Sequence, residues 1–272
     1  MSGRREVALR IGSAVVLLPG VIWLIQRSVA TSAFLFALAA AIATWEYYRL
    51  VFRVLPLVAW LGVLGAAAVP LASAIAPMAP ATVLATTAIA LSMLAWASHL
   101  FVGPRERAPE RVGHVLAGFL FTSAGFTALS ILRAGSSGAA WVMVVLAASW
   151  GNDTIAYFGG RLFGRTRLSP ISPHKTWEGA VAGLAGGTAI LLVARSLIPL
   201  GLDTLDCVLL GFITGIAGPI GDLCKSMLKR AYDAKDSGHL IPGHGGVLDR
   251  IDSVLFNAMA VLLVRPLLAA IA

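Results

Sequence analysis

The sequence predicts an all-α, polytopic integral membrane protein with about nine transmembrane helices and a cytoplasmic N-terminus. Of its 272 residues, 58% are hydrophobic and only 12% are charged, with a mean hydropathy of +0.85, whereas soluble domains carry about 25% charged residues. Apolar runs approaching the roughly 20 residues that cross a bilayer recur along the chain. Basic residues gather at alternate ends of these runs, which is the pattern that sets membrane orientation.

The predicted spans follow one another with short polar breaks. The first two are short, and they are separated only by Gln26, Arg27 and Ser28. A basic start followed by an apolar stretch could instead be a signal peptide cleaved after residues 28–30, but a span followed at once by eight more is better explained as an anchor. The nine predicted spans are residues 11–26, 29–45, 55–76, 82–102, 112–132, 138–158, 177–198, 206–228 and 250–271.

The net charge of +8 is explained by membrane topology. If the N-terminus is cytoplasmic, nearly all of the 21 basic residues fall at the inner ends of spans, and the positive-inside rule accounts for this asymmetry. A basic inner face also attracts anionic lipid, and we therefore expect no nucleic-acid partner. The basic residues left for the outer side are Arg27, Arg133, Arg195 and Arg265.

The spans are interrupted by three polar segments, 103–114, 159–176 and 229–249, which are all cytoplasmic in this topology. Two of them lie in the second part of the chain. We therefore expect the transmembrane helices of residues 111–272, with their loops, to carry any catalytic site. The helices of residues 1–110 are expected to anchor the chain in the membrane.

Four aspartates mark the cytoplasmic ends of three predicted spans. Asp153 lies in the sixth span and Asp222 in the eighth, while Asp249 and Asp252 open the ninth. A charge in hydrocarbon is costly and usually faces a cavity or a partner. Each aspartate could pair with a nearby Lys or Arg only to fix helix packing, but this is less plausible for all four together.

The segment GIAGPIGDLCKSMLKR at 215–230 surrounds Asp222 with glycines and Pro219. These residues could allow close helix packing or a kink. Alternatively, they could break the helix, so that freed backbone groups and the carboxylate line a polar cavity. In either case Asp222 needs a partner, and a divalent cation is a candidate.

The two longer loops have the composition that phosphate chemistry requires. Mg²⁺ is usually held by one or two carboxylates and by phosphate oxygens, and glycines let backbone N–H groups approach an anion. Ser172 or Thr176 could cap the seventh span, where an anion could bind. Basic loops alone are weak evidence, since cytoplasmic loops are generally basic. The loop cations are Arg161, Arg165, Arg167 and Lys175, then Lys229, Arg230, Lys235, His244 and Arg250.

The stretch SMLKRAYDAKDSGHLIPGHGGVLDRID at 226–252 resembles the signature of the phosphatidate cytidylyltransferase family, the CDP-diacylglycerol synthases. Every fixed position of the pattern is filled over these 27 residues, which is far more specific than a short motif. NDTIAYFGGRLFG at 152–164 and ISPHKTWEG at 171–179 are similar to the family's second conserved region. Ile155 is a mild departure, at a position where many members have a small residue.

The resemblance implies that CTP and phosphatidic acid react to give CDP-diacylglycerol and pyrophosphate in bacterial phospholipid synthesis. The lipid phosphate would attack the α-phosphorus of CTP, and it is already anionic, so the site must mainly bring two polyanions together. The resemblance also implies Mg²⁺ held by Asp222 and Asp249, with room for a second monovalent or divalent cation. It further implies a homodimer in the bacterial inner membrane with its active site facing the cytoplasm.

The resemblance also assigns residue roles. Phosphates would be neutralised by Lys229, Arg230, Lys235 and Arg250, which join Asp222 and Asp249 in the catalytic set. For His244, donation to a phosphate and bonding to loop backbone are both open. The expected substrate-binding residues are Ser172, Lys175, Thr176, Glu178, Asp153, Ser226, Asp236, His244 and Asp252.

Other functions are possible on the same residues. A CTP-dependent polyprenol or phytol kinase, or a synthase for an ether-lipid phosphate, shares distant similarity. A CDP-alcohol phosphotransferase is disfavoured because its Asp-Gly-x-x-Ala-Arg pattern is absent. A transporter with Asp153 and Asp222 as ion sites is disfavoured because no repeat is visible and the polar features gather on one side. WEYYRL at 45–50 resembles a family feature, and an interfacial aromatic belt explains it equally well.

Overall fold

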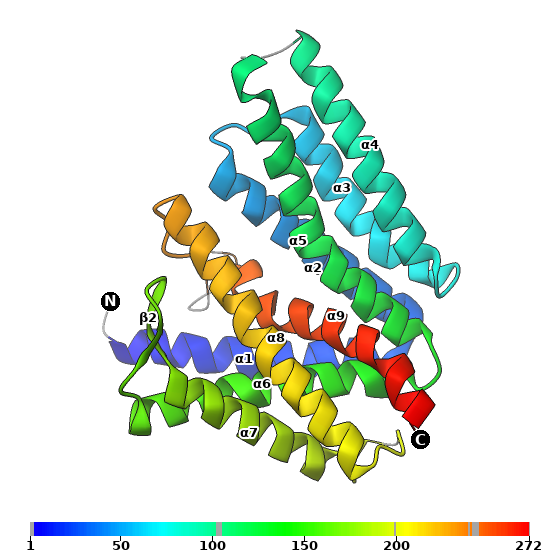
Figure 1. Ribbon diagram of the computed structural model, residues 1–272. Coiled ribbons are helices and arrows are strands. Elements are labelled where there is room, and N and C mark those ends of the chain that lie inside the picture. Colours follow the sequence, from blue (N-terminus) through cyan, green and yellow to red (C-terminus); the bar gives the residue numbers. More distant parts are fainter. Residues whose placement is uncertain (1–2, 102–104, 199, 239, 241–244, 272) are drawn as a thin grey trace. The chain divides into compact units, whose positions relative to one another are not determined.

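The computed structural model describes residues 3–101, 105–198, 200–238, 240 and 245–271, with side chains at these positions except 3–11, 13, 14, 16 and 269–271. This part of the chain forms nine α-helices, two short 3₁₀ turns and one β-hairpin (Figure 1). The helices are α1 (Gly3–Arg27), α2 (Val29–Val51), α3 (Leu57–Leu71), α4 (Ala79–Phe101), α5 (Ala108–Ala134), α6 (Gly138–Phe163), α7 (Trp177–Ala194), α8 (Thr204–Ala231) and α9 (Leu248–Ile271).

The predicted all-α membrane architecture is confirmed, since each predicted span overlaps one of these helices. Among the described residues, seven helices are long and apolar enough to cross a membrane: α2, α3 together with the 3₁₀ turn Ala72–Ala74, α4, α5, α7, α8 and α9. The helices α1 and α6 are not among them, and α1 contributes only the shorter apolar stretch Leu17–Arg27. Nine crossings and a cytoplasmic N-terminus therefore stay predictions.

The loop predicted at 159–176 contains regular structure. Helix α6 continues to Phe163, and the strands β1 (Arg167–Ser169) and β2 (Ser172–Thr176) pair antiparallel after it. Their register places Ser169 opposite Ser172, so that a two-residue turn containing Pro170 joins them. The hairpin ends where α7 begins, at Trp177, whose N–H donates to the carbonyl of Thr166.

The predicted break between the first two spans is a true helix boundary. Ser28 separates α1 from α2, and Thr31 completes a capping box in which each side chain accepts the other residue's N–H at 3.1 Å. Such caps satisfy backbone donors that have no partner inside the helix. Arg133, at the end of α5, also donates to the carbonyl of Ile25 at 2.8 Å and to Ser32 Oγ at 3.0 Å.

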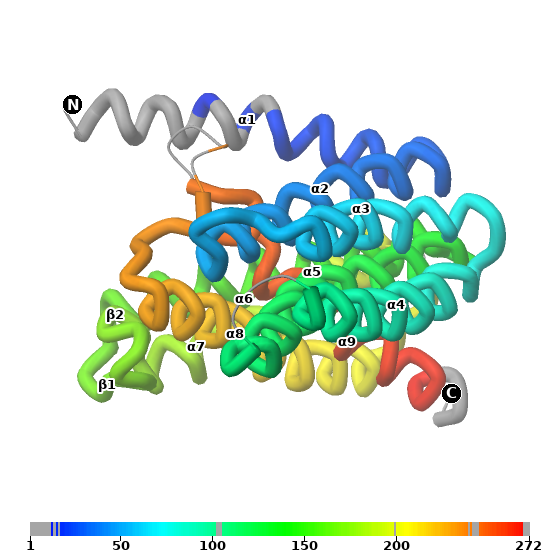
Figure 2. Tube along the Cα trace, turned by 90° about the horizontal axis from the view of Figure 1, so that it is seen from above, coloured from blue at the N-terminus to red at the C-terminus, as the bar shows by residue number. Residues whose placement is uncertain are grey.

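The chain folds as two compact units, and each has its own helix packing. The first unit comprises Met1–Ala134 and Ala234–Arg250, and within it α3, α4 and α5 lie side by side (Figure 2). Buried polar bonds join α2 to α5: Tyr48 donates to the carbonyl of Val115 at 2.7 Å, and the hydroxyls of Thr44 and Thr122 are 2.6 Å apart. The predicted boundary near residue 110 separates expected roles, membrane anchoring before it and catalysis after it, rather than packing units. It stays a prediction.

The second unit comprises Gly135–Asp233 and Ile251–Ala272. Small residues let its helices approach closely, as in many membrane bundles. A Cβ added at Gly183 of α7 would meet Asn152 of α6, and one at Gly221 of α8 would lie 2.7 Å from the carbonyl oxygen of Asp252 on α9. Asn257 of α9 also donates to Ser149 of α6 at 2.8 Å.

The glycines around Asp222 serve this packing. Helix α8 is continuous from Thr204 to Ala231 and contains Pro219 without a break. Of the two alternatives, the broken helix is therefore wrong, and the close packing of helices is found at these glycines.

Candidate active site

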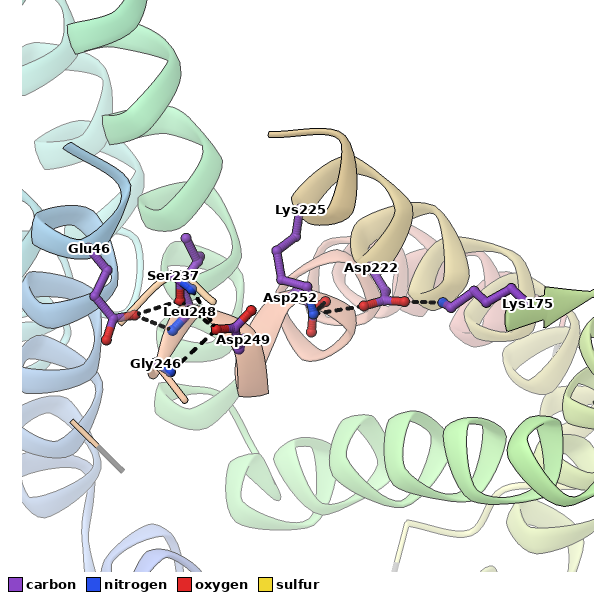
Figure 3. A network of polar contacts seen from close by, with 9 residues as sticks. All are labelled: Glu46, Lys175, Asp222, Lys225, Ser237, Gly246, Leu248, Asp249 and Asp252. Carbon is purple, nitrogen blue, oxygen red and sulfur yellow. Dashed lines mark hydrogen bonds and ion pairs between the residues drawn. The ribbon is translucent and has the colours of Figure 1, made fainter. Parts of the chain in front are cut away.

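The second unit contains a group of opposite charges that we call the aspartate–lysine cluster: Lys175, Asp222, Lys225 and Asp252 (Figure 3). Lys225 Nζ lies 2.7 Å from Asp222 Oδ1 and 2.6 Å from Asp252 Oδ2. Lys175 Nζ forms an ion pair with the other carboxylate oxygen of Asp222. The Lys225 and Asp252 side chains are only 8% and 6% exposed, so neither charge could remain there without its partner.

Three helices and the hairpin position this cluster. Asp222 and Lys225 are three residues apart on α8 and therefore lie on one face of it. Asp252 follows on α9, and Lys175 lies on β2, just before α7. Asp153 of α6 adds a third carboxylate, because it hydrogen-bonds Ser253 and interacts electrostatically with the cluster's lysines and Asp222. Three carboxylates then face two ammonium groups, and this arrangement favours cations.

The first unit contains a second polar group, the glutamate–serine–aspartate cluster: Glu46, Ser237 and Asp249. Asp249 Oδ2 accepts the N–H of Ser237 at 2.8 Å, its hydroxyl at 2.9 Å and the N–H of Gly246 at 3.3 Å. The Ser237 hydroxyl also lies 3.2 Å from Glu46 Oε2. A hydroxyl carries one proton, so Ser237 donates to one of the two carboxylates at a time.

Glu178, a predicted substrate-binding residue, has a local structural task. Its carboxylate accepts the N–H groups of Arg165 at 3.1 Å and Thr166 at 3.2 Å. It thereby ties the start of the hairpin to the first turn of α7. Of the two caps that the sequence allowed, Thr176 is the N-cap of α7 and accepts the N–H of Gly179 at 3.1 Å, while Ser172 lies beside the hairpin turn.

The remaining predicted residues lie at the ends of helices or in the last loop. Lys229 and Arg230 are in the last turn of α8, and Ser226 is half-buried one turn earlier. Lys235, Asp236 and Arg250 are exposed and belong to the first unit. His244 lies outside the described residues. The structure thus brings together Asp153, Lys175, Asp222 and Asp252 in the second unit, and it places Asp249 in the first.

The sequence model of the cytidylyltransferase family matches residues 8–268. The chain belongs to this family. Phosphatidate cytidylyltransferase 4, chloroplastic, of Arabidopsis thaliana is 48% identical over 105 residues, which cover 39% of this chain and 27% of that protein. The phosphatidate cytidylyltransferase of Brucella abortus biovar 1 is 40% identical over 150 residues, which are 54% of each chain.

A third relative, the phosphatidate cytidylyltransferase of Helicobacter pylori strain J99, is 40% identical over 147 residues, which cover 52% of this chain and 53% of that protein. This cytidylyltransferase-family chain therefore spans about half the length, or less, of the curated relatives that it matches.

The Asp carboxylates of this family member are the type of oxygen ligand that Mg²⁺ prefers. Within the described part of the chain, no three His, Cys, Asp or Glu side chains gather as a metal-binding group. Mg²⁺ needs only one or two protein carboxylates, since water and substrate phosphates supply its other oxygens. Asp222 and Asp249, the ligands that the resemblance implies, belong to different units. Their role as metal ligands stays a prediction.

Three residues of these clusters were not predicted from the sequence. Lys225 is a lysine inside a span and three residues from Asp222, a signal that could have found it. Glu46 lies one residue beyond the predicted span 29–45, so it was not counted as an intramembrane acid, although α2 continues to Val51. Ser237 lies in the signature, but it carried no chemical signal of its own.

Proposed function

We propose that this protein transfers the cytidylyl group of CTP to phosphatidic acid, giving CDP-diacylglycerol and pyrophosphate. The observation that carries the proposal is the family match over residues 8–268, which includes the complete signature at 226–252. The aspartate–lysine cluster supports it, because it gathers paired charges on helices that suit a membrane. With Asp153 the cluster has one more carboxylate than ammonium groups, so it can hold a cation that offsets the charge of two polyanionic substrates.

In the proposed reaction, an oxygen of the lipid phosphate forms a bond to the α-phosphorus of CTP. The bond from that phosphorus to the oxygen bridging to the β-phosphate breaks, and pyrophosphate leaves with the electron pair. A phosphate monoester is largely dianionic at neutral pH, so the nucleophile needs no strong general base. The protein's task is to align the two substrates and offset their charge.

The described side chains can share this task. Lys225 is buried and holds Asp222 and Asp252 in one orientation. The Lys175 side chain is 30% exposed, so its ammonium group can reach a phosphate oxygen. Mg²⁺, with Asp222 and Asp249 as its proposed ligands and a second cation as an option, would supply positive charge to phosphate oxygens.

The proposed location is the bacterial inner membrane, with the site facing the cytoplasm and the chain forming a homodimer. The basic residues support this orientation, because they gather at the ends of spans that would be cytoplasmic. Phosphatidic acid could then arrive laterally from the bilayer and CTP from water. Reaction of an engineered surface cysteine with a membrane-impermeant thiol reagent in intact cells would test the orientation, and light scattering in detergent would test the dimer.

The first experiment is pyrophosphate release by the purified protein in mixed micelles. CTP, phosphatidic acid and Mg²⁺ are present together and are then omitted one at a time. We expect release only when all three are present, with the lipid product carrying the cytidylyl group. Formation of CDP from CTP and a polyprenol, without pyrophosphate release from phosphatidic acid, would contradict the proposal and favour the kinase alternative.

A further inference from the structure

Glu46 of α2 is fully buried, at 0% exposure, although it is an acid in a predominantly apolar helix. Its Oε2 accepts the N–H of Leu248 at 2.8 Å, and its Oε1 accepts the N–H of Val247 at 3.0 Å. A buried carboxylate is costly unless it is hydrogen-bonded. These bonds, all within the first unit, therefore hold Glu46 to the start of α9.

The two amides are donors that α9 cannot satisfy by itself. The first N–H groups of a helix have no partner inside it and are usually capped by Ser, Thr, Asp or Asn. Val247 occupies the position before Leu248, the first residue of α9, and its side chain cannot accept a hydrogen bond. Glu46 provides the cap instead from 202 residues away in the sequence, and its negative charge suits the positive end of the helix dipole.

Ser237 extends this contact to Asp249. Its hydroxyl lies between Glu46 Oε2 and Asp249 Oδ2, and its N–H also binds Asp249 Oδ2. The segment closes tightly here, since a Cβ at Gly238 would lie 2.6 Å from Glu46 Oε1 and one at Gly246 would lie 2.5 Å from Glu46 Oε2. The position of Glu46 therefore fixes the groups that orient the Asp249 carboxylate (Figure 3).

We propose that Glu46 is a positioning residue for the transfer reaction. It acts by capping α9 and holding Ser237, so that Asp249 points in one direction. The inference rests on the proposed function, in which Asp249 belongs to the catalytic set. It also gives α2 a task in the reaction, whereas the sequence indicated only membrane anchoring for residues 1–110.

The test is Glu46→Gln, which keeps the size of the side chain but replaces one acceptor oxygen with an N–H₂ group facing a donor. We expect faster hydrogen–deuterium exchange in peptides covering residues 245–252, and a fall in kcat of roughly 10- to 100-fold, because small misplacements of reacting groups have effects of this size. KM for CTP and phosphatidic acid should change less than about 3-fold, because Glu46 touches neither substrate in this proposal.

The matched control is Glu106→Gln, the same substitution at an exposed glutamate of the first unit. Its hydrogen–deuterium exchange at residues 245–252 and its kcat should equal those of the wild type. Glu46→Asp keeps both acceptor oxygens on a shorter side chain and should recover part of the lost kcat. If Glu46→Gln does not fold, Ser237→Ala takes its place, because it removes only the bridging hydroxyl and should lower kcat in the same way.

Two results would overturn the inference: a Glu46→Gln protein with wild-type kcat, or one with lowered kcat and unchanged exchange at residues 245–252. If Ser237→Ala is the variant tested, wild-type kcat would overturn it too. Absence of activity in both the wild type and Glu106→Gln would instead overturn the proposed function. The exchange measurement would then still decide whether Glu46 holds the start of α9.

Discussion

The two polar clusters stabilise buried carboxylates in different ways. In the aspartate–lysine cluster, Asp222 and Asp252 are paired with the ammonium group of Lys225. In the glutamate–serine–aspartate cluster, the contacts described for Glu46 are backbone N–H groups and a hydroxyl. A buried ion pair needs both of its partners and responds to added charge, whereas hydrogen bonds from fixed amides set direction. The first arrangement suits charged ligands, and the second suits the orientation of a neighbouring group.

The largest effect is expected from removing a carboxylate charge. Asp222→Asn and Asp249→Asn should each lower turnover by about 1,000-fold or more, since charge stabilisation dominates phosphate chemistry, with little loss of folded protein. Pyrophosphate release and size-exclusion chromatography would measure the two quantities. Asp233→Asn is the control, because Asp233 is exposed and its positive φ suits Asn. Near wild-type activity in either variant would exclude the two-carboxylate magnesium site.

A second variant tests whether charge pairing also stabilises the fold. Lys225→Met should lower the free energy of unfolding by about 3–5 kcal/mol, because it leaves the buried Asp252 carboxylate without its counter-charge. Thermal unfolding in detergent would follow the loss. Adding Asp252→Asn should recover part of it, and a double-mutant cycle would give the coupling energy. Independent, additive effects would mean that the Lys225–Asp252 pair contributes nothing to stability.

Lys175→Ala is expected to affect binding more than stability, because Lys175 is the more exposed lysine of the cluster. KM for CTP or phosphatidic acid should rise roughly 10-fold, as a charge-assisted contact to phosphate is lost. His174→Ala, at the exposed neighbouring position on β2, should leave KM unchanged. Steady-state kinetics with each substrate varied in turn would separate the effects, and unchanged KM and kcat would remove Lys175 from the site.

The smallest effect is expected at Glu178. Its carboxylate accepts backbone N–H groups, as the Glu46 carboxylate does, but it lies near the surface. Glu178→Gln should loosen the start of the hairpin and make trypsin cleavage after Arg165 and Arg167 about 2- to 5-fold faster. Glu106→Gln again serves as the control. Equal cleavage rates in the two variants would show that Glu178 does not hold this segment.

Most of the fold could be predicted because the bilayer requires long apolar runs. Hydropathy detects the apolar runs rather than the ends of helices. It therefore placed the end of the sixth span at residue 158, although α6 continues to Phe163. The hairpin was missed because its strands are short, polar and separated by a turn at Pro170. Hydropathy could not separate such strands from a loop.

The candidate site was predicted in part. Asp222 was identified as an acid inside the eighth predicted span, Asp252 lies in the signature and Lys175 lies in the second conserved block, and the structure brings these three residues to one cluster. Lys225 carried a signal, since it lies inside a span and three residues from Asp222, but only the packing of α8 against α9 shows that it also contacts Asp252. Glu46 was missed because its partners are about 200 residues away, and one sequence does not show such contacts.

The cap on α9 has a consequence for biogenesis. Glu46 enters the membrane with α2, long before Val247 and Leu248 have been synthesised. At translation rates of about 5–20 residues per second, the intervening 202 residues correspond to roughly 10–40 s during which the nascent chain carries this carboxylate without its final partners. The start of α9 can therefore close only after Val247 and Leu248 have left the ribosome.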